Sequence, residues 1–155
     1  MVSGDDILGV ACDTGRFTRY AAKTAGHVWG VDVSKGMLEK AGRYARREGI
    51  ENVTFARMDA GNLHFRSDFF DGVACCWALH LFPDVRGPPG EIHRVLAPGG
   101  RFAGATLREE LRQLLLDAGL GAVEFEQRGG ALFFGASAEG WSATRRCVLG
   151  HPRRR

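Results

Sequence analysis

Residues 6–24 read DILGVACDTGRFTRYAAKT, and this stretch decides the class of the fold. Its first five residues form an apolar run with the length of a buried strand. The next five, ACDTG, are small or turn-forming, and residues 16–24 have the apolar spacing of a helix. The stretch therefore predicts a strand, a tight turn and a helix, which is the first part of a βαβ unit.

The same alternation continues on the C-terminal side of this stretch. Ser34 suits a helix N-cap and Gly49 a C-cap, and APGG at residues 97–100 predicts a turn into a strand. Alternating strands and helices predict right-handed βαβ units, hence a parallel sheet with helices on both faces. We expect strands at residues 27–31, 53–57, 70–76 and 101–105, and helices at residues 34–48 and 91–96.

The C-terminal part departs from this alternation. A helix is expected at residues 108–118, closed by Gly119, followed by strands at residues 122–127 and 131–135. The turn between these two strands, at residues 128–130, is too short for a crossover, so the strands must be antiparallel. The predicted fold class is α/β, with mostly parallel strands ending in an antiparallel C-terminal β-hairpin and helices on both faces.

Length and charge favour one domain with a basic tail. The chain has 155 residues, 45% hydrophobic and 25% charged, which is enough for a self-sufficient core. Its formal net charge of +3 divides into +5 for residues 141–155 and −2 for residues 1–140. We expect the domain in residues 1–140 and a tail in residues 141–155. Because no basic stripe continues onto the body, a solvated tail is favoured over nucleic-acid binding.

Membrane, secreted and metal-binding proteins have patterns that this sequence lacks. No apolar run reaches the roughly 20 residues of a membrane span, and residues 1–6 do not resemble a signal peptide. We therefore expect a cytoplasmic protein without a membrane span. Cys12, Cys75, Cys76 and Cys147 have no zinc-ligand spacing, so free thiols and no metal are expected.

In an open parallel sheet, ligands bind at the carboxyl ends of the strands, so the candidate residues follow each strand. The small residues after the first strand allow the backbone to approach a ligand at a helix N-terminus. Asp32 ends the second strand, where a carboxylate can accept both hydroxyls of a ribose. Asp59 and Ala60 follow the third strand, and Trp77 follows the fourth. Together these positions predict a nucleoside pocket.

The loop after the first strand narrows the choice of nucleoside. It lacks the GxGxxG pattern, and Asp13 would repel a pyrophosphate, so a dinucleotide is disfavoured. A carboxylate there is compatible with a positively charged ligand, such as the ammonium or sulfonium of S-adenosylmethionine. The alternative is that Asp13 or Thr14 caps the following helix, and that Asp32 is a turn residue before the helix at Ser34.

Five ordered motifs resemble those of the class I S-adenosylmethionine-dependent methyltransferases, especially the small-molecule type that includes ubiquinone and menaquinone biosynthesis enzymes. The resemblance covers about residues 6–105 and implies a Rossmann-like methyltransferase sheet. The motifs are ILGVACDTGRF at residues 7–17, GVDVS at residues 30–34 with Met37-Leu38, Asp59-Ala60 with Leu63 and Phe65, FDGV at residues 70–73, and RVLAPGG at residues 94–100.

The resemblance also implies roles for single residues. Asp32 would bind the ribose hydroxyls, Asp59 the adenine amino group, and the Ala60 backbone amide the adenine edge. Trp77 would face the methionine moiety or the acceptor. His80 is the candidate catalytic base, and a packed or capping histidine is the alternative. The full set of expected cofactor contacts is Ala11, Cys12, Asp13, Gly15, Asp32, Val33, Met37, Asp59, Ala60 and Trp77.

Two departures from the family pattern bear on function. Gly9 stands where the family usually has Asp, and Asp13 where it has the second loop glycine. Few residues are left to cover the pocket or contact an acceptor. The leading hypothesis is S-adenosylmethionine-dependent methyl transfer to a small-molecule acceptor by a minimal domain. The alternatives are a catalytically silent methyltransferase-like binding or assembly module and a nicotinamide-dependent enzyme. A homodimer that covers the pocket stays an alternative to a monomer.

Overall fold

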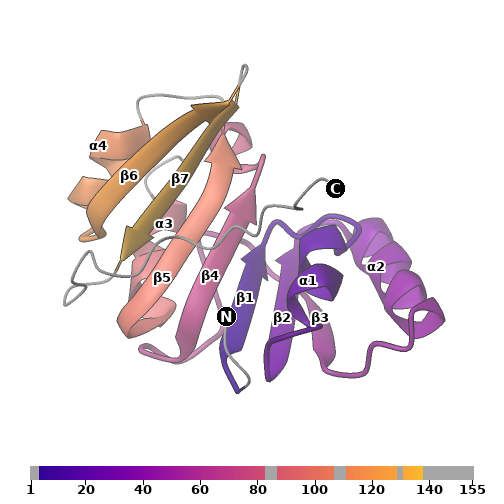
Figure 1. Cartoon of the computed structure of the whole chain (residues 1–155). Helices are drawn as coiled ribbons and strands as arrows, with labels where there is room; N and C mark the ends of the chain where they lie inside the picture. Colours follow the sequence, from indigo (N-terminus) through magenta and orange to yellow (C-terminus); the bar gives the residue numbers. More distant parts are fainter. Residues whose placement is uncertain (1–3, 83–86, 107–110, 129–130, 138–155) are drawn as a thin grey trace, which may run out of the picture.

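The computed structural model describes residues 4–82, 87–106, 111–128 and 131–137. Within these ranges one seven-stranded sheet runs through the molecule in the order β3-β2-β1-β4-β5-β7-β6 (Figure 1). The predicted tail at residues 141–155 and its boundary with the domain lie outside the described residues.

The first five strands are parallel, as predicted. Val10 pairs with Val31 on one side and with Cys75 on the other, so the carboxyl ends of β1, β2 and β4 finish level with one another. Strand order reverses between β1 and β4, which is where open sheets of this kind bind ligands. The strands are β1 Asp6–Val10, β2 His27–Asp32, β3 Val53–Arg57, β4 Phe70–Cys76 and β5 Leu96–Thr106.

The predicted C-terminal hairpin is confirmed. Strands β6 Gly121–Arg128 and β7 Ala131–Ser137 are antiparallel, and β7 is also antiparallel to β5 and lies between the two. The helix before them is α4 Leu111–Asp117, and Gly119 follows it with a φ of 87°, which suits a glycine after a helix. The first residues predicted for this helix, 108–110, lie outside the described residues.

Helix α1 Arg16–Ala21 is shorter than predicted, whereas α2 Lys35–Arg47 has the expected ends. Ser34 is the N-cap of α2, and its Oγ accepts from the Met37 amide at 3.4 Å. Gly49 follows the end of α2 with φ 66°, and its amide donates to the Arg46 carbonyl. The N-cap prediction is therefore confirmed, whereas the C-cap is Glu48 and Gly49 is the residue after it.

The helix predicted at residues 91–96 begins earlier and ends one residue sooner, as α3 Gly87–Val95. Pro88 and Pro89 lie in its first turn. Backbone amides in the first turn of a helix have no partner within the helix, so proline loses nothing there.

The predicted APGG turn lies inside β5 rather than before it. Phe70 pairs with Leu96, and the next pair joins Gly72 to Arg101, so β5 has an irregularity that takes up the extra residues. Gly99 has φ 77° within this segment, a conformation that glycine adopts at little cost.

Side chains that alternate along β1 pack into two cores on opposite faces of the sheet. Ile7 packs with Ala21 of α1 and with Val28, in a cluster made mostly of small side chains. Leu8 belongs to the larger cluster, which includes Ile92 of α3, Leu115 of α4 and several phenylalanines. Helices therefore cover both faces, as predicted. None of the described helices is long and apolar enough to cross a lipid bilayer.

Candidate functional site

The loop that leaves β1 alternates in and out of the left-handed backbone region. Ala11, Asp13 and Gly15 have φ values of 51°, 50° and 72°. Only glycine adopts this region without strain, and for other residues the cost is about 1 kcal/mol each. Every second residue of the loop thus has a conformation that glycine prefers, although only Gly15 is a glycine. Asp13 is exposed and Ala11 is half-buried.

Asp32 joins this loop to the loop after β2. Its Oδ2 accepts from the Asp13 amide and its Oδ1 from the Ser34 amide, both at 2.9 Å. Asp32 is half-buried. Because each carboxylate oxygen can accept two hydrogen bonds, both oxygens keep acceptor capacity. The turn interpretation and the ligand interpretation of Asp32 are therefore compatible.

Phe55 of β3 forms the floor under the first loop. A Cβ atom at Gly15 would lie 2.8 Å from Phe55 Cε1, and one at Gly30 would lie 2.8 Å from Phe55 Cδ1. Neither glycine tolerates a side chain while that ring is in place. Sequence reasoning missed Phe55, although a glycine inside the apolar second strand indicates the close approach of another group.

Arg19 of α1 is a second supporting residue that the sequence analysis missed. Its Nη1 donates to the Thr14 carbonyl, and its Nε donates to Glu48 Oε1 at 2.9 Å. The guanidinium also lies 5.1 Å from the centre of the Tyr44 ring. Arg19 thereby ties the first loop to the end of α2.

The predicted capping role of Asp13 or Thr14 is wrong. The N-cap of α1 is Gly15, and no side chain makes a capping hydrogen bond there. With φ 72°, Gly15 continues the loop conformation up to the first turn of the helix. The Asp13 carboxylate therefore stays exposed at the mouth of the loop.

The loops after β2 and β3 lie against each other. The Met58 amide donates to the Asp32 carbonyl at 3.1 Å, so Asp59 begins next to the end of β2. Asp59 is exposed, and its Oδ1 accepts from the Gly61 amide at 2.7 Å. Ala60 is buried, Met37 is half-buried in the first turn of α2, and Val33 is 59% exposed.

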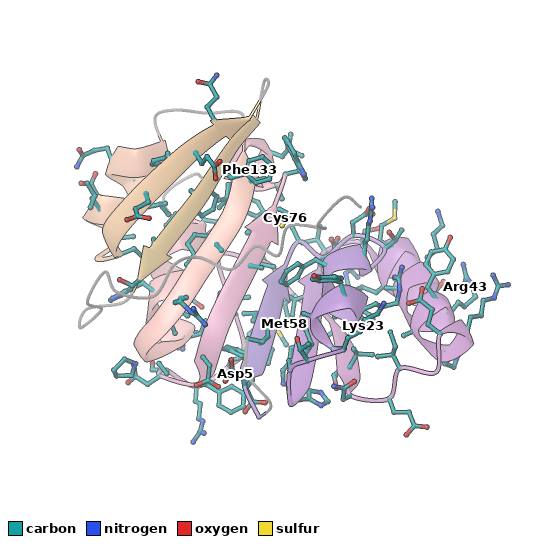
Figure 2. All side chains as sticks on the ribbon, in the orientation of Figure 1. Asp5, Lys23, Arg43, Met58, Cys76 and Phe133 are labelled. Carbon is teal, nitrogen blue, oxygen red and sulfur yellow. The ribbon has the colours of Figure 1, made fainter. Side chains whose placement is uncertain are left out.

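Trp77 lies beyond β4, on the other side of the strand-order reversal. It has φ 64°, which is unusual for so bulky a residue, and its amide donates to the Ala105 carbonyl at 2.7 Å. Trp77 is 46% exposed, and its indole meets Phe133 of β7 edge to face, with ring centres 6.4 Å apart. Figure 2 labels Phe133 and Cys76, the last residue of β4. His80 lies in the short 3₁₀ helix η1 Leu79–Leu81, and its side chain is outside the described residues.

The described cysteines near this end of the sheet are not activated as nucleophiles. The Cys12 amide donates to the Val31 carbonyl at 2.9 Å. Burial, followed by the negative charge of Asp32, raises the pKa of the Cys12 thiol to about 12. Burial also raises the pKa of the Cys75 thiol. Cys12, Cys75 and Cys76 are free, as expected, and Cys147 is outside the described residues. A neutral thiol is a poor nucleophile, so Cys12 contributes shape rather than reactivity.

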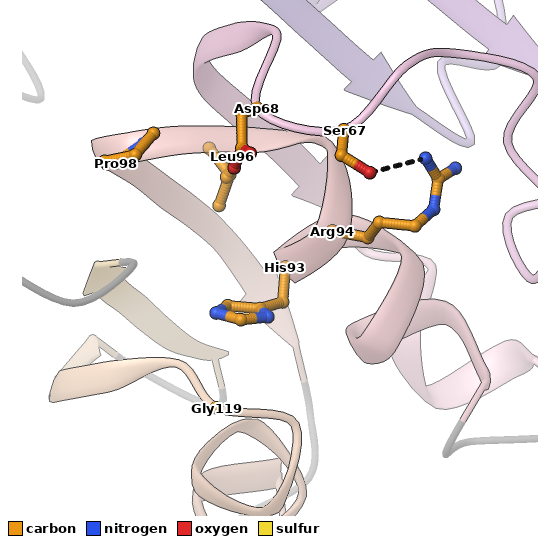
Figure 3. A pocket seen from close by; sticks show the side chains of 7 residues that line it. All are labelled: Ser67, Asp68, His93, Arg94, Leu96, Pro98 and Gly119. Carbon is orange, nitrogen blue, oxygen red and sulfur yellow. Dashed lines mark hydrogen bonds between the residues drawn. The ribbon is translucent and has the colours of Figure 1, made fainter.

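A hollow of about 710 Å³ opens at the opposite edge of the sheet, near the amino ends of β4 and β5 (Figure 3). None of the residues predicted to contact a cofactor lines it. The candidate site at the carboxyl edge is therefore separate from this hollow. The residues that line the hollow are Ser67, Asp68, His93, Arg94, Leu96, Pro98 and Gly119.

Comparison with known sequences agrees with this geometry. Residues 7–100 match the model of a family described as a methyltransferase domain. A demethylmenaquinone methyltransferase of Symbiobacterium thermophilum is 43% identical over 103 residues, which are 64% of this chain and 41% of that protein. An uncharacterized methyltransferase, YcgJ of Bacillus subtilis, is 45% identical over 73 residues, 47% of this chain and 29% of that protein. The chain thus spans less than half the length of these curated relatives.

Solved structures have the same fold. The YcgJ protein from Bacillus subtilis aligns with a TM-score of 0.83 and 18% identity over 90% of this chain and 94% of its own. A phosphoethanolamine N-methyltransferase 2 of Haemonchus contortus, solved in complex with S-adenosyl-L-methionine, aligns with a TM-score of 0.79 and 19% identity over 89% of this chain and 49% of its own. Together with the strand order and the match over residues 7–100, these likenesses show that the chain belongs to the methyltransferase domain family and has the Rossmann-like fold of class I S-adenosylmethionine-dependent methyltransferases.

Proposed function

We propose that the protein binds S-adenosylmethionine at the carboxyl edge of β1, β2 and β3 and transfers its methyl group to a small-molecule acceptor. The observation that carries the proposal is the Asp32 carboxylate. It ends β2, is held between the two loop amides of Asp13 and Ser34, and keeps acceptor capacity on both oxygens for the hydroxyls of a ribose.

We assign the binding of the adenine to Asp59 and Ala60. Asp59 uses Oδ1 for its own turn, and no described residue donates to Oδ2, which suits an exocyclic amino group. Within the described part of the chain nothing accepts a hydrogen bond from the Ala60 amide, which suits a ring nitrogen of adenine. We assign the half-buried Met37 and the exposed Val33 as apolar contacts of the adenine.

The methionine end falls to the loop of residues 11–15. Its left-handed turns and the small side chains of Ala11 and Gly15 let the backbone approach the ligand closely. Asp13 has an exposed carboxylate and donates its backbone amide to Asp32, and the charges of both residues act on Cys12. Together they give the loop a negative region that favours an ammonium and a sulfonium. Cys12, which is neutral, leaves that charge balance unchanged.

The cofactor supplies a methyl group on a sulfonium, which is a good leaving group. The chain's own contribution is to hold the two reactants in line, and orientation of this kind can account for much of an enzyme's acceleration. Trp77, exposed beyond β4, is the aromatic surface that we assign to the acceptor. A base is needed only if the acceptor must lose a proton, and His80 keeps that proposed role. Demethylmenaquinone methyltransferases among the relatives support an acceptor that is a small molecule.

Calorimetric titration with S-adenosylmethionine and S-adenosylhomocysteine tests the proposal. We expect both to bind, and Asp32→Ala to weaken binding about ten- to a hundredfold, because two hydrogen bonds to a charged acceptor are lost. Asp117→Ala on α4 is the matched control and should leave affinity unchanged. Absence of heat at millimolar ligand in the unsubstituted protein would refute the proposal.

A further inference from the structure

The segment that carries Asp59 and Ala60 has no helix to support it. Residues 58–69 connect β3 to β4, all of them are described, and none is helical. A connection of this length without regular structure depends on side chains to satisfy its backbone groups and fix its path. The residues that supply those bonds therefore decide where Asp59 and Ala60 lie.

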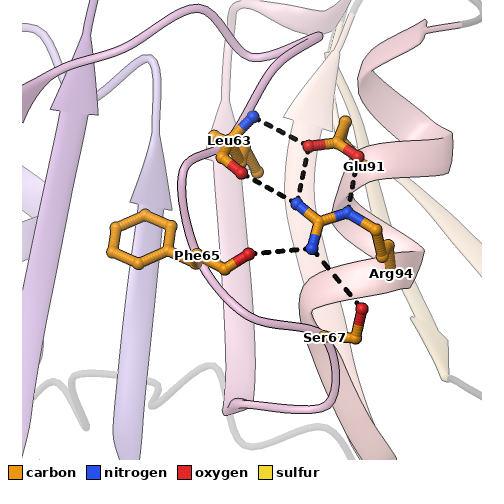
Figure 4. Close-up of polar contacts among 5 residues, drawn as sticks. All are labelled: Leu63, Phe65, Ser67, Glu91 and Arg94. Atoms are coloured by element: carbon orange, nitrogen blue, oxygen red, sulfur yellow. Dashed lines mark hydrogen bonds and ion pairs between the residues drawn. The ribbon is translucent and has the colours of Figure 1, made fainter.

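Arg94 of α3 supplies most of them (Figure 4). Its Nη2 donates to the Leu63 carbonyl and its Nη1 to the Phe65 carbonyl, both at 2.8 Å. Nη1 also donates to Ser67 Oγ at 3.5 Å. The remaining two donors bind Glu91, with Nε to Oε1 at 2.6 Å and Nη2 to Oε2 at 2.8 Å. All five donors of the guanidinium are thereby used.

Glu91 closes the network from the other side. Its Oε2 accepts from the Leu63 amide at 2.8 Å, so Leu63 is held at both its amide and its carbonyl. Hydrogen bonding to Arg94 lowers the pKa of Glu91 and, in return, raises that of Arg94. Further along, the Asp68 amide donates to the Arg94 carbonyl at 3.0 Å. The connecting segment of residues 58–69 is therefore held against α3, and we call it the strap.

We propose that Glu91 and Arg94 are a positioning pair that sets the adenine end of the cofactor site. This inference rests on the proposed function. The pair holds Leu63, which is buried in the same core cluster as Ala60, and the turn begun by Asp59 lies directly before it. Since no donor of Arg94 remains for a ligand, the pair acts through the segment and touches no substrate.

The ribose end gives a contrast that makes the inference testable. Asp32 is held by the amides of Asp13 and Ser34, and none of those bonds involves α3. Loosening the pair should therefore affect binding through Asp59 and leave binding through Asp32 intact. A segment that must be ordered on binding lowers affinity, because the lost freedom is subtracted from the contacts it makes.

Double-mutant cycles on S-adenosylhomocysteine affinity test this coupling. Arg94→Lys keeps the charge and loses the fork of donors, and we expect affinity to fall about tenfold. In that background Asp59→Ala should cost little further, whereas Asp32→Ala should cost its full amount. Arg43→Lys on the exposed side of α2 is the control, since Arg43 points into solvent (Figure 2). Effects of Asp59 and Asp32 that are equally additive with Arg94→Lys would overturn the inference.

Hydrogen exchange in the ligand-free protein provides a second measurement. Arg94→Lys and Glu91→Gln should speed exchange of the Leu63 amide and its neighbours in residues 60–63, with no change at the Ser34 amide. Unchanged exchange in residues 60–63 would overturn the inference even if affinity fell. If the unsubstituted protein bound no S-adenosylhomocysteine, the proposed function would fail, while the exchange data would still decide whether the pair orders this segment.

Discussion

The two ends of the proposed cofactor site are held in different ways. The ribose end is held by backbone amides on either side of Asp32, from loops that directly continue β1 and β2. The adenine end is held by the side chains of Glu91 and Arg94, about thirty residues away in sequence. The ribose end is therefore held by the loops that leave the sheet. The adenine end depends on one ion pair of α3, a helix that packs in the larger of the two cores.

Arg94→Ala should break the adenine end and have the largest effect. It leaves the carbonyls of Leu63 and Phe65 without their donor and Glu91 without its partner. We expect the free energy of unfolding to fall by about 2 kcal/mol or more. Chemical denaturation measures it, and Arg43→Ala should cost about 0.5 kcal/mol at most. Equal losses for the two arginines would mean that the strap is not held by Arg94.

Acid should weaken the adenine end when Glu91 becomes protonated. The folded-state pKa of Glu91 is lowered, chiefly by its hydrogen bond to Arg94. The stability that its ionised form contributes is therefore present above the ordinary glutamate pKa and is lost as pH falls through the lowered value. From pH 6 downward, the free energy of unfolding should fall more steeply in the unsubstituted protein than in Glu91→Gln. Parallel curves would contradict the assigned direction.

Relieving the left-handed residues should stabilise the loop of residues 11–15, whose Asp13 amide binds Asp32. Ala11→Gly should raise the free energy of unfolding by about 0.5–1 kcal/mol, and Asp13→Gly by less, because Asp tolerates this region better than Ala. The two variants form a matched pair, since only Asp13→Gly removes a charge. We expect Asp13→Gly alone to reduce affinity for S-adenosylmethionine more than affinity for the uncharged-sulfur product. Calorimetric titration with both ligands measures the ratio of the two affinities. The same ratio in Ala11→Gly and Asp13→Gly would show that the Asp13 charge does not act on the ligand.

The smallest expected effect concerns Cys12. Asp32 helps to raise its pKa, but burial is the larger cause. Asp32→Asn should therefore lower the pKa of Cys12 only slightly and speed alkylation at pH 8 at most a few-fold. Peptide mass spectrometry can follow Cys12 with Cys76, at the end of β4, as the internal reference. A large acceleration would show that Asp32→Asn opens the loop instead of removing a charge.

Sequence alone predicts candidate site residues only from their position after each strand. Asp32 and Asp59 are candidates because each follows an apolar run, and the parallel pairing of β2 with β3 brings the ends of those runs together. The predicted start of α3 at residue 91 was wrong, because prolines at 88 and 89 suit both a turn and the first turn of a helix. Phe55 and Arg19 were missed, since their roles depend on what packs beneath and beside the loop.

Periodicity and the order of the apolar runs by themselves determined which residues form strands, which two strands form the hairpin and which residues follow each strand, because alternation within a strand and tight turns depend on residues close together in the sequence. Only the tertiary structure decided how the loops are held. The left-handed turns at Ala11 and Asp13 and the strap on Arg94 come from partners distant in the chain, and no local pattern encodes such contacts. The physical reason is that a loop without regular hydrogen bonding takes the shape that its packed surroundings satisfy.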